Sequence, residues 1–206
     1  MSERLSELPV SAPQELTPEP AQERSDAARN RALLLKAARD LVATRGADAV
    51  TMDDIATAAG VGKGTLFRRF GSRAGLMMVL LDEDERASQE AFLFGPPPLG
   101  PDAPPLERLL AFGRDRICFV HAHHALLSAA NRNPQSRYGP AAAVTRTHVR
   151  VLLHSARTTG DLDAQTDALL ALLDADYVEH QLHHGGHTLE TLGKAWESLA
   201  RKLCGR

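Results

Sequence analysis

The sequence has few of the residues that build cross-linked, aromatic or membrane-spanning proteins. Only 2 of its 206 residues are cysteine, and aromatic residues make up 4%. Cys118 and Cys204 are far apart and neither has a CxxC partner, so we expect neither a disulfide framework nor a thiolate zinc site. The longest apolar runs, such as residues 76–81, are too short to span a bilayer, and the N-terminus lacks a secretion signal. These absences predict a cytoplasmic protein with no membrane partner.

The short motifs of common enzymes are also missing. The sequence contains no GxSxG, HExxH, P-loop or dinucleotide-binding fingerprint, and no Ser/His/Asp or Cys/His grouping is recognisable from its spacing. We therefore expect no enzymatic activity, no catalytic residue and no cofactor.

The strict apolar–polar alternation of a half-buried strand is absent, whereas Ala and Leu recur at helical spacing. With 43% apolar residues, the chain is long enough for a small module and a larger helical domain. The predicted fold class is all-α, with a small three-helix head, a larger helical domain and about nine helices in total.

Glycine, proline and capping residues divide the chain. Residues 1–25 are rich in Pro, Glu, Ser and Gln, and we expect them to form a disordered arm. We expect the head at 26–75, with a linking helix that Ser72 caps and that continues to about residue 94. The remaining domain is expected at 104–206. Its predicted helices span residues 105–130, 141–158, 164–184 and 188–204, and Asp161 or Asp163 starts the third of them.

Charge is unevenly distributed. The formal net charge is −2, yet no acidic residue occurs between Ile55 and Leu81, where Lys63, Arg68, Arg69 and Arg73 fall close together. A local charge of about +4 is sufficient for phosphate contact. A cluster of this kind on a helix is often only a solvated face, so its surroundings decide the interpretation.

Those surroundings form a motif. Thr51 and Asp54 fit a capping box that starts a short helix, Gly60 ends it, and a second short helix over 63–70 turns Leu66 inward. The whole segment 51–76, TMDDIATAAGVGKGTLFRRFGSRAGL, resembles the DNA-binding signature of the TetR family, including its AxxAGV turn and KGTL(F/Y)xxF recognition helix. The resemblance implies an operator-binding head followed by a helical body. For the body, the resemblance rests on its helical architecture alone and not on a sequence motif.

In a helix-turn-helix, the second helix enters the major groove of DNA with its N-terminal residues nearest the bases. Lys63 and Arg68 are predicted to donate to guanine, while Thr51 and Arg73 are placed like phosphate clamps. Phe67 replaces a tyrosine that is frequent in the family, and we expect the neighbouring cation to compensate. The predicted DNA-binding residues are Thr51, Lys63, Gly64, Thr65, Phe67, Arg68, Arg69 and Arg73.

The resemblance implies that the body dimerises through its last two helices and binds a small molecule between the others. The C-terminal helix has apolar residues at 3-4 spacing, which suits either a dimer seam or an intramolecular core. The predicted dimer residues are Leu169, Leu173, Leu189, Leu192, Trp196, Leu199 and Leu203. The predicted pocket residues are Ile117, His121, His124, His148, Val151, Leu152 and Tyr177.

All nine histidines lie between residues 121 and 187. His180, His183, His184 and His187 have spacing that can assemble a metal site, but Gly185 and Gly186 interrupt the helix, and we expect no metal.

Together these features predict a transcriptional regulator, associated with the nucleoid, that binds a palindromic operator as a homodimer. We expect a repressor that an unidentified small-molecule effector releases. The alternative is an adaptor that uses the helix-turn-helix for protein contact.

Overall fold

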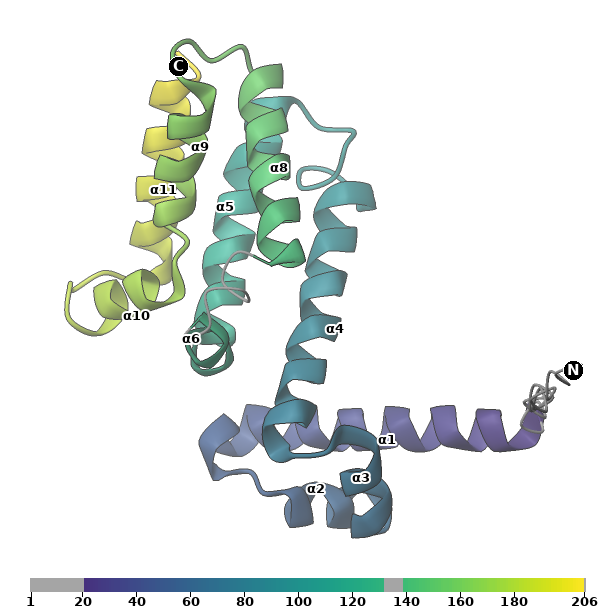
Figure 1. The fold of residues 1–206 in the computed structure, drawn as a ribbon. Helices are drawn as coiled ribbons and strands as arrows, with labels where there is room; N and C mark the ends of the chain where they lie inside the picture. The colour runs from purple at the N-terminus through teal and green to yellow at the C-terminus, as the bar shows by residue number, and fades with distance from the viewer. Residues whose placement is uncertain (1–20, 132–138, 206) are drawn as a thin grey trace, which may run out of the picture.

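The computed structural model describes residues 21–131 and 139–205, and these residues form an all-α protein (Figure 1). A long N-terminal helix lies across the base of the molecule, and one helix rises from there into an upright helical body. The ten α-helices of the described residues, with one short 3-10 helix η1 (Ala47–Ala49), are α1 (Ala21–Arg45), α2 (Met52–Ala59), α3 (Lys63–Phe70), α4 (Arg73–Phe94), α5 (Pro105–Ala122), α6 (His124–Asn131), α8 (Pro140–Ser155), α9 (Leu162–Ala171), α10 (Ala175–His183) and α11 (Leu189–Leu203).

The head consists of α1, α2, α3 and the first half of α4, which share a small core. Leu34 and Ala38 of α1 are buried against Ile55 of α2, Leu66 of α3 and Leu76 of α4. Each helix buries one face, as the four-residue spacing of its apolar residues predicts. The head therefore has a core of its own, built from one face of each short helix.

Helix α1 begins at Ala21, earlier than the predicted start at residue 26. Residues 21–25, which the sequence analysis assigned to the disordered arm, are therefore helical. They follow Pro20 directly and include Ala, Gln, Glu and Arg, which are favourable in helices. The rest of the predicted arm, residues 1–20, lies outside the described residues.

The body is arranged around α5, which packs against α11 on one side and α8 on the other. Trp196 of α11 is 1% exposed, and its indole N–H donates to the Leu109 carbonyl oxygen at 3.0 Å. The ring lies over Gly113 of α5, where any larger residue would collide with it. This contact joins two helices more than 80 residues apart in the sequence and anchors the core of the body.

One predicted helix is wrong: the segment expected to run unbroken over 105–130 is divided into α5 and α6 at His123. The His123 ring stacks on Phe119 with centroids 4.2 Å apart, and its Nδ1–H donates to the Phe119 carbonyl oxygen at 2.8 Å. The same carbonyl oxygen accepts the His123 backbone N–H at 3.0 Å, so α5 keeps its last helical hydrogen bond, and His123 ends the helix with φ −113° and ψ 12°.

The segment expected as one helix over 164–184 is likewise divided, into α9 and α10. Asp174 lies in extended backbone, and its carboxylate accepts the backbone N–H groups of Asp176 and Tyr177. This N-cap starts a new helix, which the apolar periodicity of the segment concealed. Asp161 caps α9 in the same way, as one of the two predicted alternatives.

Candidate nucleic-acid interface

The start of α2 is fixed by the capping box that the sequence predicted. The Thr51 hydroxyl oxygen accepts the Asp54 N–H at 3.2 Å, and the Asp54 carboxylate accepts the Thr51 N–H at 3.0 Å and its hydroxyl proton at 2.7 Å. Hydrogen bonds from the Thr51 hydroxyl and then from its backbone lower the pKa of Asp54. Thr51 therefore caps α2 whether or not it also contacts a phosphate.

The turn between α2 and α3 depends on Gly60. Its φ of 64° lies in the left-handed region that favours glycine, and the next N–H, of Val61, donates to the Ala56 carbonyl oxygen at 3.0 Å. The two helices are thereby held in a fixed helix-turn-helix arrangement.

Helix α3 is held by one face and presents the other. Leu66 is fully buried in the head core, and Phe70 is half-buried beside it. The opposite face exposes Gly64, Phe67 and Arg68, together with the other predicted cations of this helix. An alanine Cβ at Gly64 would have no neighbour within 4 Å, so the space in front of the helix is open.

The predicted DNA-binding cations differ in the intramolecular ion pairs and hydrogen bonds that they form. Lys63 forms an ion pair with Asp53 at 2.7 Å, a partner that sequence reasoning missed, and its ammonium lies 5.9 Å from the Phe67 ring centroid. Arg68 is exposed and has no hydrogen-bond or ion-pair partner within the described part of the chain. Arg68 is therefore the cation of α3 that is most available to a ligand.

The other two arginines hold the head together. The Arg69 guanidinium donates to the Ala27 carbonyl oxygen of α1 at 2.5 Å. Arg73 donates to the carbonyl oxygens of Val50, at 2.8 Å, and of Ala47. Both side chains thus have an intramolecular role that their spacing in the sequence did not reveal.

The predicted pocket residues do not all lie together. His148, Ile117 and Leu152 are buried in the body core. The other four lie toward the surface: His121 bonds Glu179 at 3.1 Å, His124 lies 3.4 Å from Asp176, and Val151 and Tyr177 are exposed.

His148 is a polar residue in an apolar place. Its ring lies 4.4 Å from that of Phe92 and 5.0 Å from that of Phe112, and its Nε2 has no hydrogen-bond partner within residues 21–131 and 139–205. Burial, with a smaller contribution from the charge of Arg108, lowers its pKa from 6.5 to about 4. The imidazole is therefore neutral at physiological pH.

The predicted dimer residues are used largely inside the chain. Leu169, Leu173, Leu192 and Trp196 lie in the body core, which accounts for the 3-4 spacing of α11 without a second subunit. Leu189, Leu199 and Leu203 are half-buried at the edge of this core.

The histidines of α10 and the following loop pair with other groups. His183 bonds Glu179 at 2.6 Å, and the Thr191 hydroxyl lies 3.4 Å from His187. The described residues include no group of three or more His, Cys, Asp or Glu side chains arranged to hold a metal ion. Nor does this part of the chain contain a helix with the length and apolarity needed to cross a membrane.

The capped α2, the glycine turn and the exposed α3 define a helix-turn-helix protein with an all-α body. Residues 34–78 match the family model of the bacterial regulatory proteins of the tetR family. The HTH-type transcriptional regulator AlkX of Mycobacterium tuberculosis is 49% identical over 51 residues, which are 23% of this chain and 24% of that protein. The N-terminal part of this chain is thus similar to the DNA-binding domains of this family, and the match spans about a quarter of the curated relative.

Solved structures extend the likeness in fold to the body. A TetR-like transcriptional regulator from a Rhodococcus species has 22% identity and a TM-score of 0.54, over 86% of this chain and 97% of its own. The reduced form of E. coli NemR has 17% identity and a TM-score of 0.60, covering 84% and 96%. A candidate transcriptional regulator from Saccharomonospora viridis in complex with choline has 19% identity and a TM-score of 0.62, covering 84% and 95%. The described part of the chain therefore has the fold of these solved regulators.

Proposed function

We propose that this protein is a transcriptional regulator that binds double-stranded operator DNA with α3 in the major groove. The observation that carries this proposal is the exposed face of α3, where Gly64 and Arg68 have open space in front of them on a helix fixed from behind by Leu66. An adaptor that bound protein through this surface would not require Arg68 to lack a partner among the described residues, or Gly64 to have open space in front of it.

In this arrangement each residue has a distinct task. Arg68, which has no partner among the described residues, donates to base edges or to a phosphate, and Gly64 allows the backbone to approach the DNA closely. Lys63 exchanges its ion pair with Asp53 for a phosphate. Arg69 and Arg73 act mainly by holding α1 and the loop before α2 against the DNA-binding helices.

The test is salt-titrated binding to the fragment that the purified protein enriches from genomic DNA. Arg68→Ala is expected to weaken binding by about 10- to 100-fold, the loss of about 1–3 kcal/mol that follows removal of a base contact. Gly64→Ala adds a methyl group with no neighbour within 4 Å among the described residues, so it should weaken DNA binding without lowering the thermal unfolding temperature.

A matched control comes from an exposed cation on another helix of the head. Lys36 on α1 is exposed and paired with Asp40 at 2.7 Å, so Lys36→Ala removes the same charge away from α3. If Lys36→Ala and Arg68→Ala weaken binding equally, the effect is one of net charge and α3 is not the DNA-binding helix.

We further propose that the protein binds DNA as a homodimer formed by the outer faces of α9 and α11. Small exposed residues follow these faces at helical spacing and permit close helix approach: Ala164, Ala168 and Ala171 on α9, with Thr191, Ala195 and Ser198 on α11. A two-fold pair of heads predicts a palindromic operator. Ala168→Glu with Ala195→Glu should yield monomers in sedimentation, whereas Ala143→Glu on the exposed face of α8 should not.

Finally, we propose that a small molecule bound in the body releases the operator and that the protein is a repressor. The S. viridis protein, which shares the fold, was solved with choline, and this supports a ligand-binding body. A coupling of about 1–3 kcal/mol between the two sites would weaken operator binding several-fold or more. Compounds that raise the thermal unfolding temperature should weaken operator binding, and stabilising compounds that leave it unchanged would contradict release.

A further inference from the structure

Three helices of the body, α4, α5 and α8, meet at a cluster of aromatic rings. Figure 1 shows these helices as neighbours. Phe92 of α4, Phe112 of α5 and His148 of α8 have ring centroids 4.4 to 5.2 Å apart. Each helix contributes one ring, so side chains within one turn of these rings lie in the same three-helix contact.

Buried polar atoms without a hydrogen-bond partner gather around these rings. His148 Nε2 is one of them, and Thr145 Oγ1, one turn earlier on α8, is another. Ser88 Oγ, one turn before Phe92 on α4, is a third. The Arg108 Nε of α5 is the fourth, although the Nη2 of this side chain donates to the Phe92 carbonyl oxygen at 3.3 Å. We call Ser88, Arg108, Thr145 and His148 the polar cluster.

The polar cluster has hydrogen-bond donors to spare. The Nε–H of Arg108 can only donate, the hydroxyls of Ser88 and Thr145 can donate, and His148 Nε2 donates in one tautomer of the neutral ring. Thr145 and His148 are only 7% and 6% exposed. A buried donor that lacks an acceptor is destabilising, so these side chains are poorly suited to a purely structural role. A ligand group that satisfies all four of them is a hydrogen-bond acceptor.

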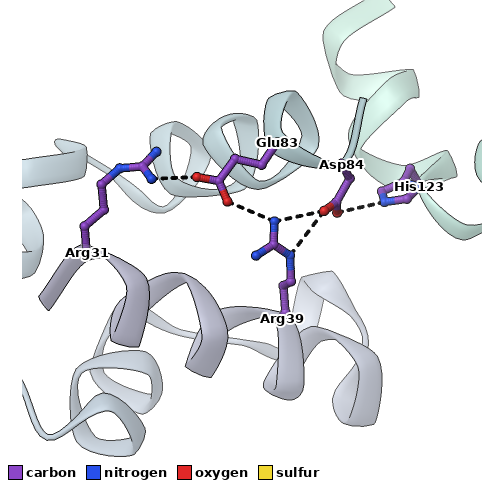
Figure 2. Close-up of polar contacts among 5 residues, drawn as sticks. All are labelled: Arg31, Arg39, Glu83, Asp84 and His123. Carbon is purple, nitrogen blue, oxygen red and sulfur yellow. Dashed lines mark hydrogen bonds and ion pairs between the residues drawn. The ribbon is translucent and has the colours of Figure 1, made fainter. Parts of the chain in front are cut away.

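Elsewhere on α4, charged groups are matched by charged or polar partners. On the face toward the head, Glu83 and Asp84 contact Arg31, Arg39 and His123, as Figure 2 shows. These carboxylates are therefore already used and do not reach the polar cluster.

The body leaves one buried cation unmatched. Glu85 of α4 pairs with Arg116 of α5 at 2.7 Å, and both side chains are largely buried. Arg108 forms no ion pair with any residue that the structure describes. Asp115, which is exposed, lies seven residues along α5 from Arg108, about 10 Å along the helix axis. The charge of Arg108 contributes to the lowered pKa of His148, so the two side chains share one electrostatic environment.

We propose that the body binds a small organic carboxylate at the polar cluster, with its oxygens accepting from Arg108, Thr145 and His148 and its apolar part against Phe92 and Phe112. The inference rests on the proposal that a small molecule binds in the body, and it names the chemical class of that molecule. Unpartnered polar atoms make this contact less stable than an apolar one. The three helices therefore separate here at lower cost than elsewhere in the core.

Matched pairs of small molecules test the class. Benzoate and octanoate carry a carboxylate, whereas benzylamine and octylamine carry an ammonium on apolar groups of the same kind. The carboxylates should raise the thermal unfolding temperature of the DNA-free protein. They should bind about 10- to 100-fold more tightly than the amines, as expected for hydrogen bonds to a charged group. Amines that stabilise the protein as strongly, or no stabilisation by either carboxylate, would overturn the proposal and leave ordered water as the partner of these atoms.

A pair of arginine variants locates the carboxylate. Arg108→Gln removes the unmatched charge and should weaken benzoate and octanoate binding by about 10- to 100-fold. Arg114→Gln is the control, because Arg114 lies on the same helix but is exposed and pairs with Glu197 of α11 at 2.6 Å. This variant should bind the carboxylates as the wild type does. Equal losses in the two variants would mean that net charge governs binding and that the site is not at Arg108.

Thr145→Val keeps the proposal testable if Arg108→Gln does not fold. Valine has a similar shape but lacks the hydroxyl, which has no hydrogen-bond partner in the described structure, so the free variant should unfold at the same or a higher temperature. Its affinity for benzoate and octanoate should fall by about 2- to 10-fold, the loss of one neutral hydrogen bond. Unchanged affinity would place the carboxylate away from Thr145 and overturn the proposal.

A signal from His148 separates this inference from operator release. Its imidazole NMR signals, assigned from His148→Gln, should shift when benzoate or octanoate is added, whereas those of the exposed His184 should not. Stabilisation without a shift at His148 would overturn the site. Carboxylates that bind here but leave operator affinity unchanged would support the site and contradict release. An amine that binds the body and weakens operator binding would support release and overturn the carboxylate class.

Discussion

The head and the body place their polar groups differently: the groups singled out in the head are exposed, and those in the body are buried. In the head, Lys63, Gly64 and Arg68 are exposed on a helix that packs on a small apolar core, and a Cβ at Gly64 would meet no atom of the described residues within 4 Å. In the body, His148 and Thr145 are buried, and each has a polar atom without a partner in the described part of the chain. The head therefore presents polar groups on its outside, whereas the body encloses some of its own.

This difference shows most clearly at two glycines. An alanine Cβ at Gly113 in the body would lie 1.9 Å from the Trp196 Nε1 atom, whereas at Gly64 in the head it would meet nothing within 4 Å. Glycine serves internal packing in the first case and an outward approach in the second.

The largest expected effect follows from this pair. Gly113→Ala should lower the free energy of unfolding by about 3 kcal/mol, because the Trp196 indole is held in place by its hydrogen bond to the Leu109 carbonyl oxygen and an extra methyl group in a packed core is destabilising. Gly64→Ala should leave stability unchanged or raise it by up to about 1 kcal/mol, since alanine favours the helix. Urea denaturation followed by circular dichroism measures both, and equal losses would remove the distinction between the two regions.

Acid should weaken the body through His148. Its pKa is lowered to about 4 in the folded protein, so the unfolded chain takes up the proton first as pH falls. Between about pH 6.5 and 5, the free energy of unfolding should fall by about 2 kcal/mol on this account. His148→Gln should lose that dependence, while His184→Gln, at an exposed position, should keep it. An unchanged pH slope in His148→Gln would show that this ring is not buried in its neutral form.

A smaller loss is expected at the capping box of the head. Thr51→Ala should cost about 1 kcal/mol, because the Asp54 N–H loses its acceptor at the start of α2. Thr51→Ser keeps the hydroxyl and should lose little. Thermal unfolding of the two variants in the absence of DNA measures the contribution of the cap apart from any phosphate contact. If Thr51→Ala and Thr51→Ser are equally stable, the capping box does not stabilise α2.

The smallest effect concerns Asp53, which neutralises Lys63 on the surface. Asp53→Asn should change stability by less than about 1 kcal/mol, as exposed ion pairs contribute little. The DNA affinity of Asp53→Asn should rise by about 3-fold at low salt, since Lys63 no longer has to break its ion pair with Asp53 to bind a phosphate. Asp40→Asn, which releases Lys36 on α1, is the control and should not change affinity.

The sequence predicted the head well because its signals are local. The Thr51 box, the Gly60 turn and the Ser72 cap each depend on residues within a few positions, and each lies where expected, with the Ser72 oxygen accepting the Gly75 N–H at 3.0 Å. The same local reasoning could not show that Arg69 bonds Ala27, 42 residues away, or that Asp53 holds Lys63.

In the body, periodicity identified the buried faces but not their partners. The 3-4 spacing of Leu192 and Trp196 predicted a seam, and the structure places both residues in the core of the same chain, against α5. The break between α5 and α6 lies at His123, whose ring stacks on Phe119 and contacts a carboxylate 39 residues away, a contact that no local pattern encodes.

The central claim is that α3 binds DNA through its exposed face, and the most direct test is the salt dependence of binding to the genomic fragment that the protein enriches. We expect a palindromic site for which the affinity falls steeply with salt concentration. The Arg68→Ala variant should bind this site more weakly. If Arg68 contacts a phosphate, the slope of log affinity against log salt concentration should also be shallower by about one in the variant. Failure to enrich any site, or binding that is indifferent to salt and to Arg68→Ala, would contradict the account and indicate a protein partner instead.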